Sequence, residues 1–126
     1  MLKDLNTMAV LPAADMTRAS NFYRNVLQLD PPDSMDEENL LFHCGDGTTF
    51  LLYKTDNAGS AKNTAMGWET SDIEGDMANL RSRGVEFEDY DFPGLTTENG
   101  LVVMPVGKAA WFTDTEGNIL NLFQRG

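Results

Sequence analysis

The chain is predicted to fold as a single α+β domain, in which two βαβββ repeats form a curved mixed sheet around a central cavity. Its 126 residues suit one domain, and 41% of them are hydrophobic, as in a globular protein with a core. A strand, a helix and further strands occur in the same order twice along the chain. We therefore divide the single domain, residues 1–126, into repeat one (1–57) and repeat two (63–126).

Repeat one opens with an apolar stretch, residues 6–14, that predicts a strand. Asp15 follows and is suited to cap a helix, because its carboxylate can accept from free backbone N–H groups. Apolar residues then recur at helical spacing: Ala19, Phe22, Tyr23, Val26 and Leu27. Residues 40–44 and 48–54 are predicted as two strands joined by the tight turn Gly45-Asp46-Gly47.

Repeat two begins after residues 55–63, which are small and polar and are interpreted as a linker. Residues 64–70 predict a strand, Asp72 a helix cap, and Gly84 the end of that helix. The remaining elements are a strand at 85–89, a long loop at 90–100, strands at 101–106 and 108–113, a turn at 114–118 and a last strand at 119–124.

The two repeats align along the sequence at two offsets, one for the helices and one for the closing hairpins. Asp15 and Asp72 are 57 residues apart, and Arg24 and Arg81 keep the same spacing. The closing hairpins align at an offset of 70, because repeat two contains the longer loop at 90–100. The agreement of these offsets supports a duplicated unit.

Charge and composition exclude several classes of partner. Nine basic residues against 20 acidic ones give a net charge of −11, which repels phosphate backbones, so no nucleic acid is expected. The excess acid either attracts a cationic ligand or only maintains solubility. No apolar stretch approaches the roughly 20 residues of a membrane span, so no membrane partner is expected. Residues 1–5 lack a signal-peptide pattern and Cys44 is the only cysteine, which together favour a cytoplasmic location.

Two motifs resemble those of a known superfamily. Residues 22–29, FYRNVLQL, resemble its helix motif FYRDVLGL, and residues 112–122, FTDTEGNILNL, resemble its closing motif FxDPDGNxLEL. Arg83-Gly84-Val85 is similar to its helix-to-strand turn. The chain thus resembles the glyoxalase/bleomycin resistance/extradiol dioxygenase (vicinal oxygen chelate) superfamily over nearly its whole length. The resemblance implies the fold and a homodimer, with sites formed between subunits in the bleomycin-resistance binders, but it does not specify a reaction.

The resemblance also implies where a metal would be held. Enzymes of the superfamily bind one divalent metal with His, Glu or Gln side chains at four strand positions. Counting from the motifs places Met8, Leu51, Ala65 and Asn121 at these positions. Divalent ions of this kind prefer imidazole and carboxylate ligands, so no metal and no cofactor are expected. His43, the only histidine, lies away from them.

Strand alternation outlines a predicted ligand pocket on one face of the strands. If Phe112 packs inward against a helix, Trp111 joins this face, and Phe92 in the long loop could close over a ligand or contact a second subunit. The ligand-binding residues predicted in this way are Met8, Leu51, Tyr53, Ala65, Glu69, Phe92, Trp111 and Asn121. The opposite face should pack on the helices through Phe50, Leu52, Met66, Trp68, Leu120 and Leu122.

Three functional hypotheses follow. The first is a metal-free small-molecule-binding protein that sequesters an aromatic or cationic compound. The second is a metal-independent isomerase or lyase that uses Glu69 as its base. Glu69 could instead pair with a cationic ligand, and an edge position in water is the interpretation that we favour for it. The third is a metal-dependent lyase or dioxygenase whose ligands lie elsewhere. His43 and Cys44 should point to opposite faces and form no dyad. Because the four usual metal-ligand positions also lack His and Glu, we expect binding rather than catalysis. No residue specifies which compound is bound.

Overall fold

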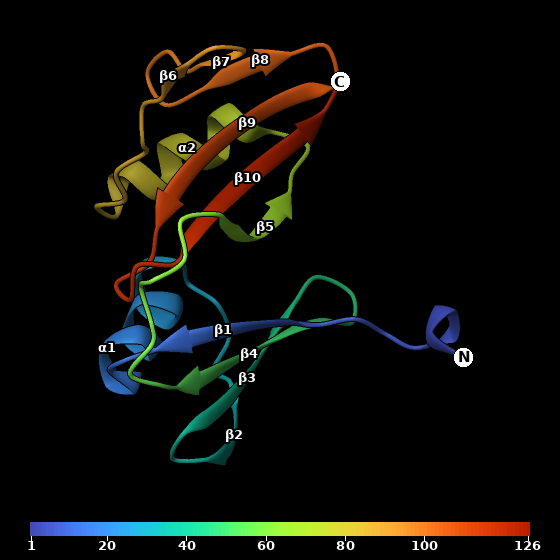
Figure 1. The fold of residues 1–126 in the computed structure, drawn as a ribbon, viewed down its shortest axis with the longest axis vertical. Coiled ribbons are helices and arrows are strands. Elements are labelled where there is room, and N and C mark those ends of the chain that lie inside the picture. Colours follow the sequence, from blue (N-terminus) through green and yellow to red (C-terminus); the bar gives the residue numbers. More distant parts are fainter.

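The computed structural model describes residues 1–126 and contains two four-stranded mixed sheets, one from each repeat (Figure 1). The first sheet has the order β1-β4-β3-β2 and the second β5-β10-β9-β8, with a separate hairpin of β6 and β7. In each sheet the strand before the helix runs parallel to the last strand of its repeat, and the other neighbours are antiparallel. The predicted α+β class with curved sheets is confirmed.

The elements of both repeats have these bounds. Repeat one contains η1 (Leu2–Asp4), β1 (Ala9–Ala13), α1 (Met16–Asn21), η2 (Phe22–Val26), β2 (Asp33–Asp36), β3 (Asn39–Cys44) and β4 (Thr48–Lys54). Repeat two contains β5 (Thr64–Glu69), α2 (Ile73–Ser82), β6 (Asp91–Phe92), β7 (Leu95–Thr96), β8 (Val102–Met104), β9 (Gly107–Thr113) and β10 (Ile119–Arg125). Neither α1 nor α2 has the length and hydrophobicity of a membrane-spanning helix.

Both helices begin where the sequence predicts. The Asp15 carboxylate accepts the backbone N–H of Arg18 at 3.0 Å, and the Asp72 carboxylate accepts that of Gly75 at 3.2 Å. The first helix widens after α1 into the π-helical turn η2, which buries both Phe22 and Tyr23. The second helix ends at Ser82, and Gly84 follows its C-cap with a φ of +93°, a conformation that glycine adopts without strain.

The structure differs from the sequence predictions at three predicted elements and contains one strand that was not predicted. β1 starts only at Ala9, and residues 1–8 extend away from the first sheet (Figure 1). β2 was not predicted, because all four of its residues are exposed and show no apolar alternation. Residues 85–89 form no strand, since their backbone gives the sheet a single bond, from Glu88 N–H to the Trp111 carbonyl at 2.8 Å. The predicted loop at 90–100 contains the short hairpin β6–β7.

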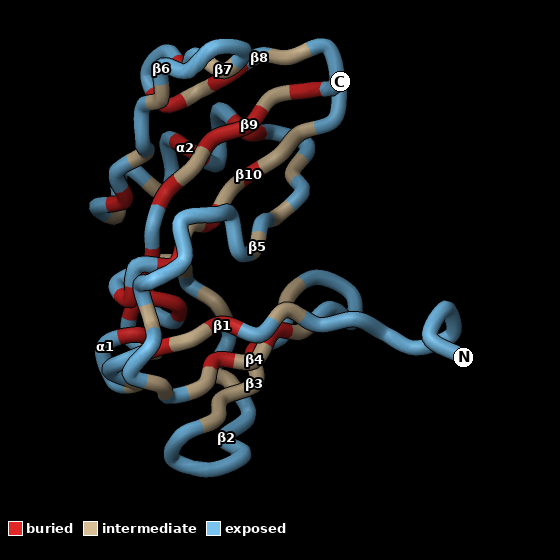
Figure 2. The backbone as a smooth tube through the Cα atoms, in the orientation of Figure 1, coloured by how far each residue is buried: buried red, intermediate tan, exposed pale blue.

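One hydrophobic core runs through both repeats. Its largest fully buried side chains are Tyr23, Phe42, Phe112, Leu11, Leu52, Ile73 and Leu120. Of the residues predicted to pack on the helices, Phe50, Leu52, Leu120 and Leu122 are buried, whereas Met66 and Trp68 are half-buried against the same core. Figure 2 shows that buried segments lie mainly on the strands and helices, while residues 1–8 are exposed.

The closing turn, residues 114–118, ties repeat two to repeat one. The buried Tyr23 hydroxyl donates to Asp114 Oδ2 at 2.6 Å, and the Asn118 side-chain amide donates to the Pro12 carbonyl at 2.9 Å. Burial and the neighbouring Asp114 charge raise the pKa of Tyr23, so it remains a hydrogen-bond donor. These contacts hold the end of β1 and the first helix against the turn between β9 and β10.

Glu116 in the same turn is fully buried and charged. Its carboxylate accepts the N–H groups of Ala14 and Asp15 at 3.0 and 2.9 Å, and Arg18 Nε at 2.8 Å. Burial opposes its ionisation, but the hydrogen bonds from Arg18, Asp15 and Thr115 outweigh this effect and lower the pKa of Glu116 to about 2. The closing turn therefore joins the repeats through a buried carboxylate with several donors.

Candidate ligand-binding site on the helix-free face

The helix-free face is the side of each sheet opposite α1 and α2. In the first sheet, the β1–β4 register places Val10 beside Leu51 and Pro12 beside Tyr53. Met8 lies just before β1, and Met8 and Val10 are 50% and 51% exposed. Leu51 and Tyr53 are half-buried. Repeat one therefore presents an apolar surface to solvent on this face.

In the second sheet, Asn121 of β10 lies between Gly67 of β5 and Trp111 of β9. The Asn121 side chain lies over Gly67, since a Cβ added to Gly67 would come within 1.7 Å of Asn121 Oδ1. The Trp111 indole reaches across β10 and donates from Nε1 to Thr64 Oγ1 at 3.1 Å. The inward packing of Phe112 thus places Trp111 on the helix-free face, as predicted.

Trp111 belongs to an aromatic cluster with Tyr90 and Phe92. The Tyr90 ring is 5.6 Å from the Trp111 ring at 74°, and the Phe92 ring is 5.4 Å from the Tyr90 ring at 23°. Phe92 is 53% exposed, and burial raises the pKa of Tyr90. Sequence reasoning identified Phe92 and Trp111 but missed Tyr90. The two-residue spacing of Tyr90 and Phe92 could have indicated that both rings lie on one side of an extended segment.

The segment that carries these rings is anchored by polar contacts. Thr97 Oγ1 accepts the Tyr90 N–H at 2.7 Å, and the Asp89 carboxylate accepts the Gly100 N–H at 2.8 Å and the Thr97 hydroxyl at 2.9 Å. The Gly100 and Thr97 bonds lower the pKa of Asp89. These contacts close the ends of residues 89–100 onto each other and support the hairpin that presents Phe92.

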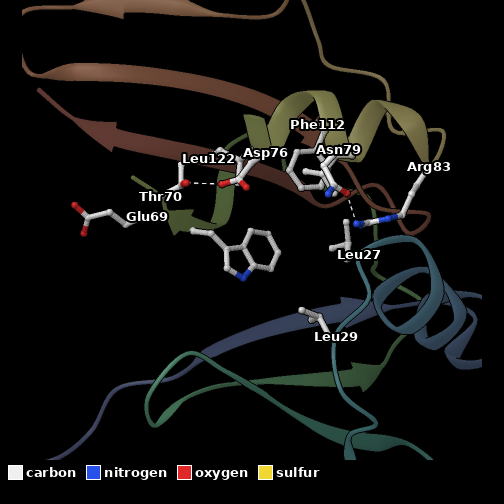
Figure 3. Close-up of a pocket in the computed structure, with 11 residues that line it drawn as sticks. Leu27, Leu29, Glu69, Thr70, Asp76, Asn79, Arg83, Phe112 and Leu122 are labelled. Atoms are coloured by element: carbon white, nitrogen blue, oxygen red, sulfur yellow. Dashed lines mark hydrogen bonds between the residues drawn. The ribbon is translucent and has the colours of Figure 1, made fainter. Parts of the chain in front are cut away.

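Two clefts lie between the repeats. One, of about 420 Å³, is lined by Met8 and Glu69 together with Cys44 and Trp68. The other, of about 360 Å³, lies between α2 and the residues that follow the first helix (Figure 3). Of the predicted ligand-binding residues, only Met8 and Glu69 line these clefts; Leu51, Tyr53, Ala65, Phe92, Trp111 and Asn121 do not. The structure instead places Trp111 and Asn121 on the second sheet, Phe92 on the separate β6–β7 hairpin, and Leu51 and Tyr53 on the first sheet.

A family model confirms the resemblance seen in the motifs. The model of the Glyoxalase/Bleomycin resistance protein/Dioxygenase superfamily matches residues 5–122. The chain belongs to this superfamily. No curated protein matches the sequence.

Solved structures of superfamily type share the fold. TnmS3, an antibiotic binding protein from Streptomyces sp. CB03234, is 23% identical over 97% of this chain and 98% of its own, with a TM-score of 0.69. A lactoylglutathione lyase from Agrobacterium tumefaciens is 16% identical over 95% of this chain and 92% of its own, with a TM-score of 0.71. The fosfomycin resistance protein FosX from Listeria monocytogenes is 14% identical over 97% and 93%, with a TM-score of 0.68. At these identities the likeness establishes the fold alone.

The four positions expected to hold a metal in this superfamily do not fit one. Met8 offers a soft thioether, Leu51 and Ala65 offer no donor, and Asn121 offers a neutral amide. Ala65 is also the unpaired residue of a β-bulge, because Thr64 and Met66 pair with the consecutive Ile119 and Leu120. No group of three or more His, Cys, Asp or Glu side chains is arranged to hold a metal elsewhere in the chain.

Glu69 does not have the environment of a general base. Its side chain is 52% exposed and forms an ion pair with Arg125, in which Nε and Oε2 are 2.5 Å apart. An enzyme that used Glu69 as its base would need this carboxylate to be buried beside a substrate. The structure instead supports the interpretation of Glu69 as an edge residue in water, with a partner in its own chain.

His43 and Cys44 form no catalytic pair. His43 is exposed and its Nε2 lies 2.8 Å from Asp33 Oδ2, whereas Cys44 is half-buried beside the 420 Å³ cleft. His43 is therefore an exposed residue of β3 that pairs with Asp33.

Proposed function

We propose that this protein binds a small, flat aromatic or cationic compound without a metal and sequesters it rather than transforming it. The observation that carries the proposal is the aromatic cluster of Trp111, Tyr90 and Phe92, which lies partly exposed on the helix-free face. Aromatic rings held in place by surrounding contacts are typical of sites that stack on planar ligands.

Three further features support the proposal. The four positions that hold the metal in superfamily enzymes lack suitable donors here. The net charge of −11 favours a cationic ligand over an anionic one. TnmS3, which has this fold, is described as an antibiotic binding protein. FosX and the lyase also have the fold, so the fold does not distinguish a binding protein from an enzyme. The binding role is supported by the site residues.

We further propose that the protein acts as a homodimer in the cytoplasm. Met8, Val10 and Phe92 are large apolar residues at least half exposed on the faces described above. A second copy placed over these faces would bury them and enclose the ligand. The single free Cys44 is suited to a reducing compartment.

Calorimetric titration with 9-aminoacridine, a flat aromatic cation, tests the proposed site. We expect saturable binding by the native protein and a Kd about tenfold weaker for Trp111→Ala, because this substitution removes the largest ring of the cluster. Val103→Ala changes an exposed residue outside the cluster and should leave the Kd unchanged.

Equal affinities for native protein and Trp111→Ala would place the ligand elsewhere. Failure of 9-aminoacridine, neutral acridine and anthraquinone alike to bind would contradict the proposed ligand class.

A further inference from the structure

The 360 Å³ cleft lies on the other side of the second sheet from the aromatic cluster. One wall is formed by α2 and the helix-facing residues of the sheet, including Phe112 and Leu122. Leu27 and Leu29 of repeat one form the opposite wall (Figure 3). Its volume falls within the range of roughly 300–1,000 Å³ that is usual for small-molecule sites.

The lining of this cleft is mainly apolar. The Trp68 ring stacks near that of Phe112, with centroids 6.3 Å apart and an angle of 15° between planes. Trp68 is only half-buried although it packs on the core, so part of the side chain is accessible from the cleft. Aliphatic side chains complete the lining: Leu27, Leu29, Leu80 and Leu122. This lining favours a compact apolar group over a charged one.

One carboxylate at the cleft has no cationic partner. Asp76, near the start of α2, accepts a hydrogen bond from the Thr70 hydroxyl and forms no ion pair (Figure 3). The Glu69 carboxylate, also at the cleft, is neutralised by Arg125. Arg83 donates to Asn79 Oδ1 and, at 3.1 Å, to the Val26 carbonyl. Two charges at the cleft therefore have no ion-pair partner, those of Asp76 and Arg83. Arg83 directs both of its terminal nitrogens to neutral oxygens of the chain, whereas Asp76 Oδ1 accepts no hydrogen bond and is free to accept from a ligand.

We propose that this cleft is a second binding site, for a compact apolar primary amine. The ammonium group would donate to Asp76, and the hydrocarbon body would lie against Trp68 and the leucines. The net charge of −11 would raise the local concentration of such a cation. This site is independent of the proposed site at Trp111, since the two tryptophans lie on opposite faces of the sheet.

The two tryptophans allow each site to be followed separately. In Trp111→Phe, Trp68 is the only tryptophan, and its emission reports on both clefts that it lines; the Asp76→Asn change separates them, because Asp76 lines only the 360 Å³ cleft. In Trp68→Phe, the emission of Trp111 reports on the helix-free face. The probe is 1-adamantylmethylamine, which is compact and does not fluoresce. 1-Adamantanemethanol and 1-adamantanecarboxylate are matched neutral and anionic probes.

We expect the amine to cause a saturable change in Trp68 emission and to bind more tightly than the alcohol, with the carboxylate weakest. Asp76→Asn, combined with Trp111→Phe, should weaken binding of the amine about fivefold and leave the affinity for the alcohol unchanged. A loss of about fivefold is what the removal of one partly exposed ion pair would cause. Glu74→Gln is the matched control, because Glu74 lies on the same helix but pairs with Lys108 outside the cleft.

Absence of a saturable Trp68 response, or equal weakening of amine and alcohol by Asp76→Asn, would overturn the second site. Neither result bears on 9-aminoacridine binding at Trp111, which is followed separately through the Trp111 emission of the Trp68→Phe protein. Loss of the Trp111 response with a retained Trp68 response would refute only the helix-free site.

Discussion

Glu116 shows how single side chains join the two repeats. Glu116 lies in repeat two, yet the backbone N–H groups and the guanidinium group that donate to its carboxylate all belong to repeat one. The sequence motif identified the closing turn but not this function, because the donors lie about a hundred positions away in the chain. Only the folded arrangement brings them to the carboxylate.

Replacing Glu116 by Gln should destabilise the protein by about 2–3 kcal/mol near neutral pH, because buried donors lose a charged acceptor. The pKa of Glu116 is lowered in the folded protein, so its ionisation stabilises the fold above about pH 5 and this contribution is lost as the pH falls toward 2. Urea unfolding should therefore show a smaller difference between native protein and Glu116→Gln at about pH 3 than at about pH 7.

Glu74→Gln is the control for that comparison. It removes one carboxylate from an exposed pair with Lys108 and should cost less than about 1 kcal/mol. An equal difference for Glu116→Gln at both pH values would show that its charge does not stabilise the fold.

For the candidate site, the sequence predicted the donor chemistry of the side chains better than it predicted their contacts. The absence of metal-ligand side chains at Met8, Leu51, Ala65 and Asn121 could be judged from the sequence, because donor chemistry depends on residue type alone. The bulge at Ala65, the ion pair of Glu69 with Arg125 and the ring contacts of Tyr90 depend on register and three-dimensional proximity. Strand alternation gives no information about these contacts.

At the scale of elements, strong local patterns were predicted well. The helix caps Asp15 and Asp72 and the glycine turn of the first hairpin rest on short-range interactions that the sequence encodes directly. β2 was missed because its residues are exposed, so its pairing with β3 left no apolar signature.

The segment at 85–92 shows the opposite error. Residues 85–89 have the alternation of a strand, but β8 pairs with the first part of β9, Gly107 to Ala109, and residues 85–89 add only the bond from Glu88 to Trp111. The chain then turns into β6–β7, which presents Tyr90 and Phe92 beside Trp111. The candidate site thus depends on the element that sequence patterns described least well.

At the scale of the whole molecule, the duplication determines the architecture. The offsets of 57 and 70 residues correspond to two sheets of the same topology, each with a parallel pair and an antiparallel hairpin. A single sheet could not cover both of its faces, so each repeat uses its helix on one face and leaves the other open. That open face is where we expect ligand and partner subunit to meet.

Sedimentation velocity should find a dimer of the 14.0 kDa chain. Val10→Asp should shift the equilibrium toward monomer by about tenfold or more, because it places a charge on the face that we expect to be covered. Val106→Asp alters an exposed residue at another surface and should leave the dimer intact. A native protein that sediments as a monomer at all concentrations would refute the proposed assembly.

Binding without a metal is tested by the thermal stability of metal-stripped protein titrated with 9-aminoacridine, with and without Ni²⁺, Zn²⁺ or Mn²⁺. We expect the Tm to rise with ligand concentration to the same extent in every sample, since a ligand at 100 times its Kd stabilises the folded state by about 2.7 kcal/mol. A rise that requires the metal, or a rise produced by stoichiometric metal alone, would contradict metal-free binding.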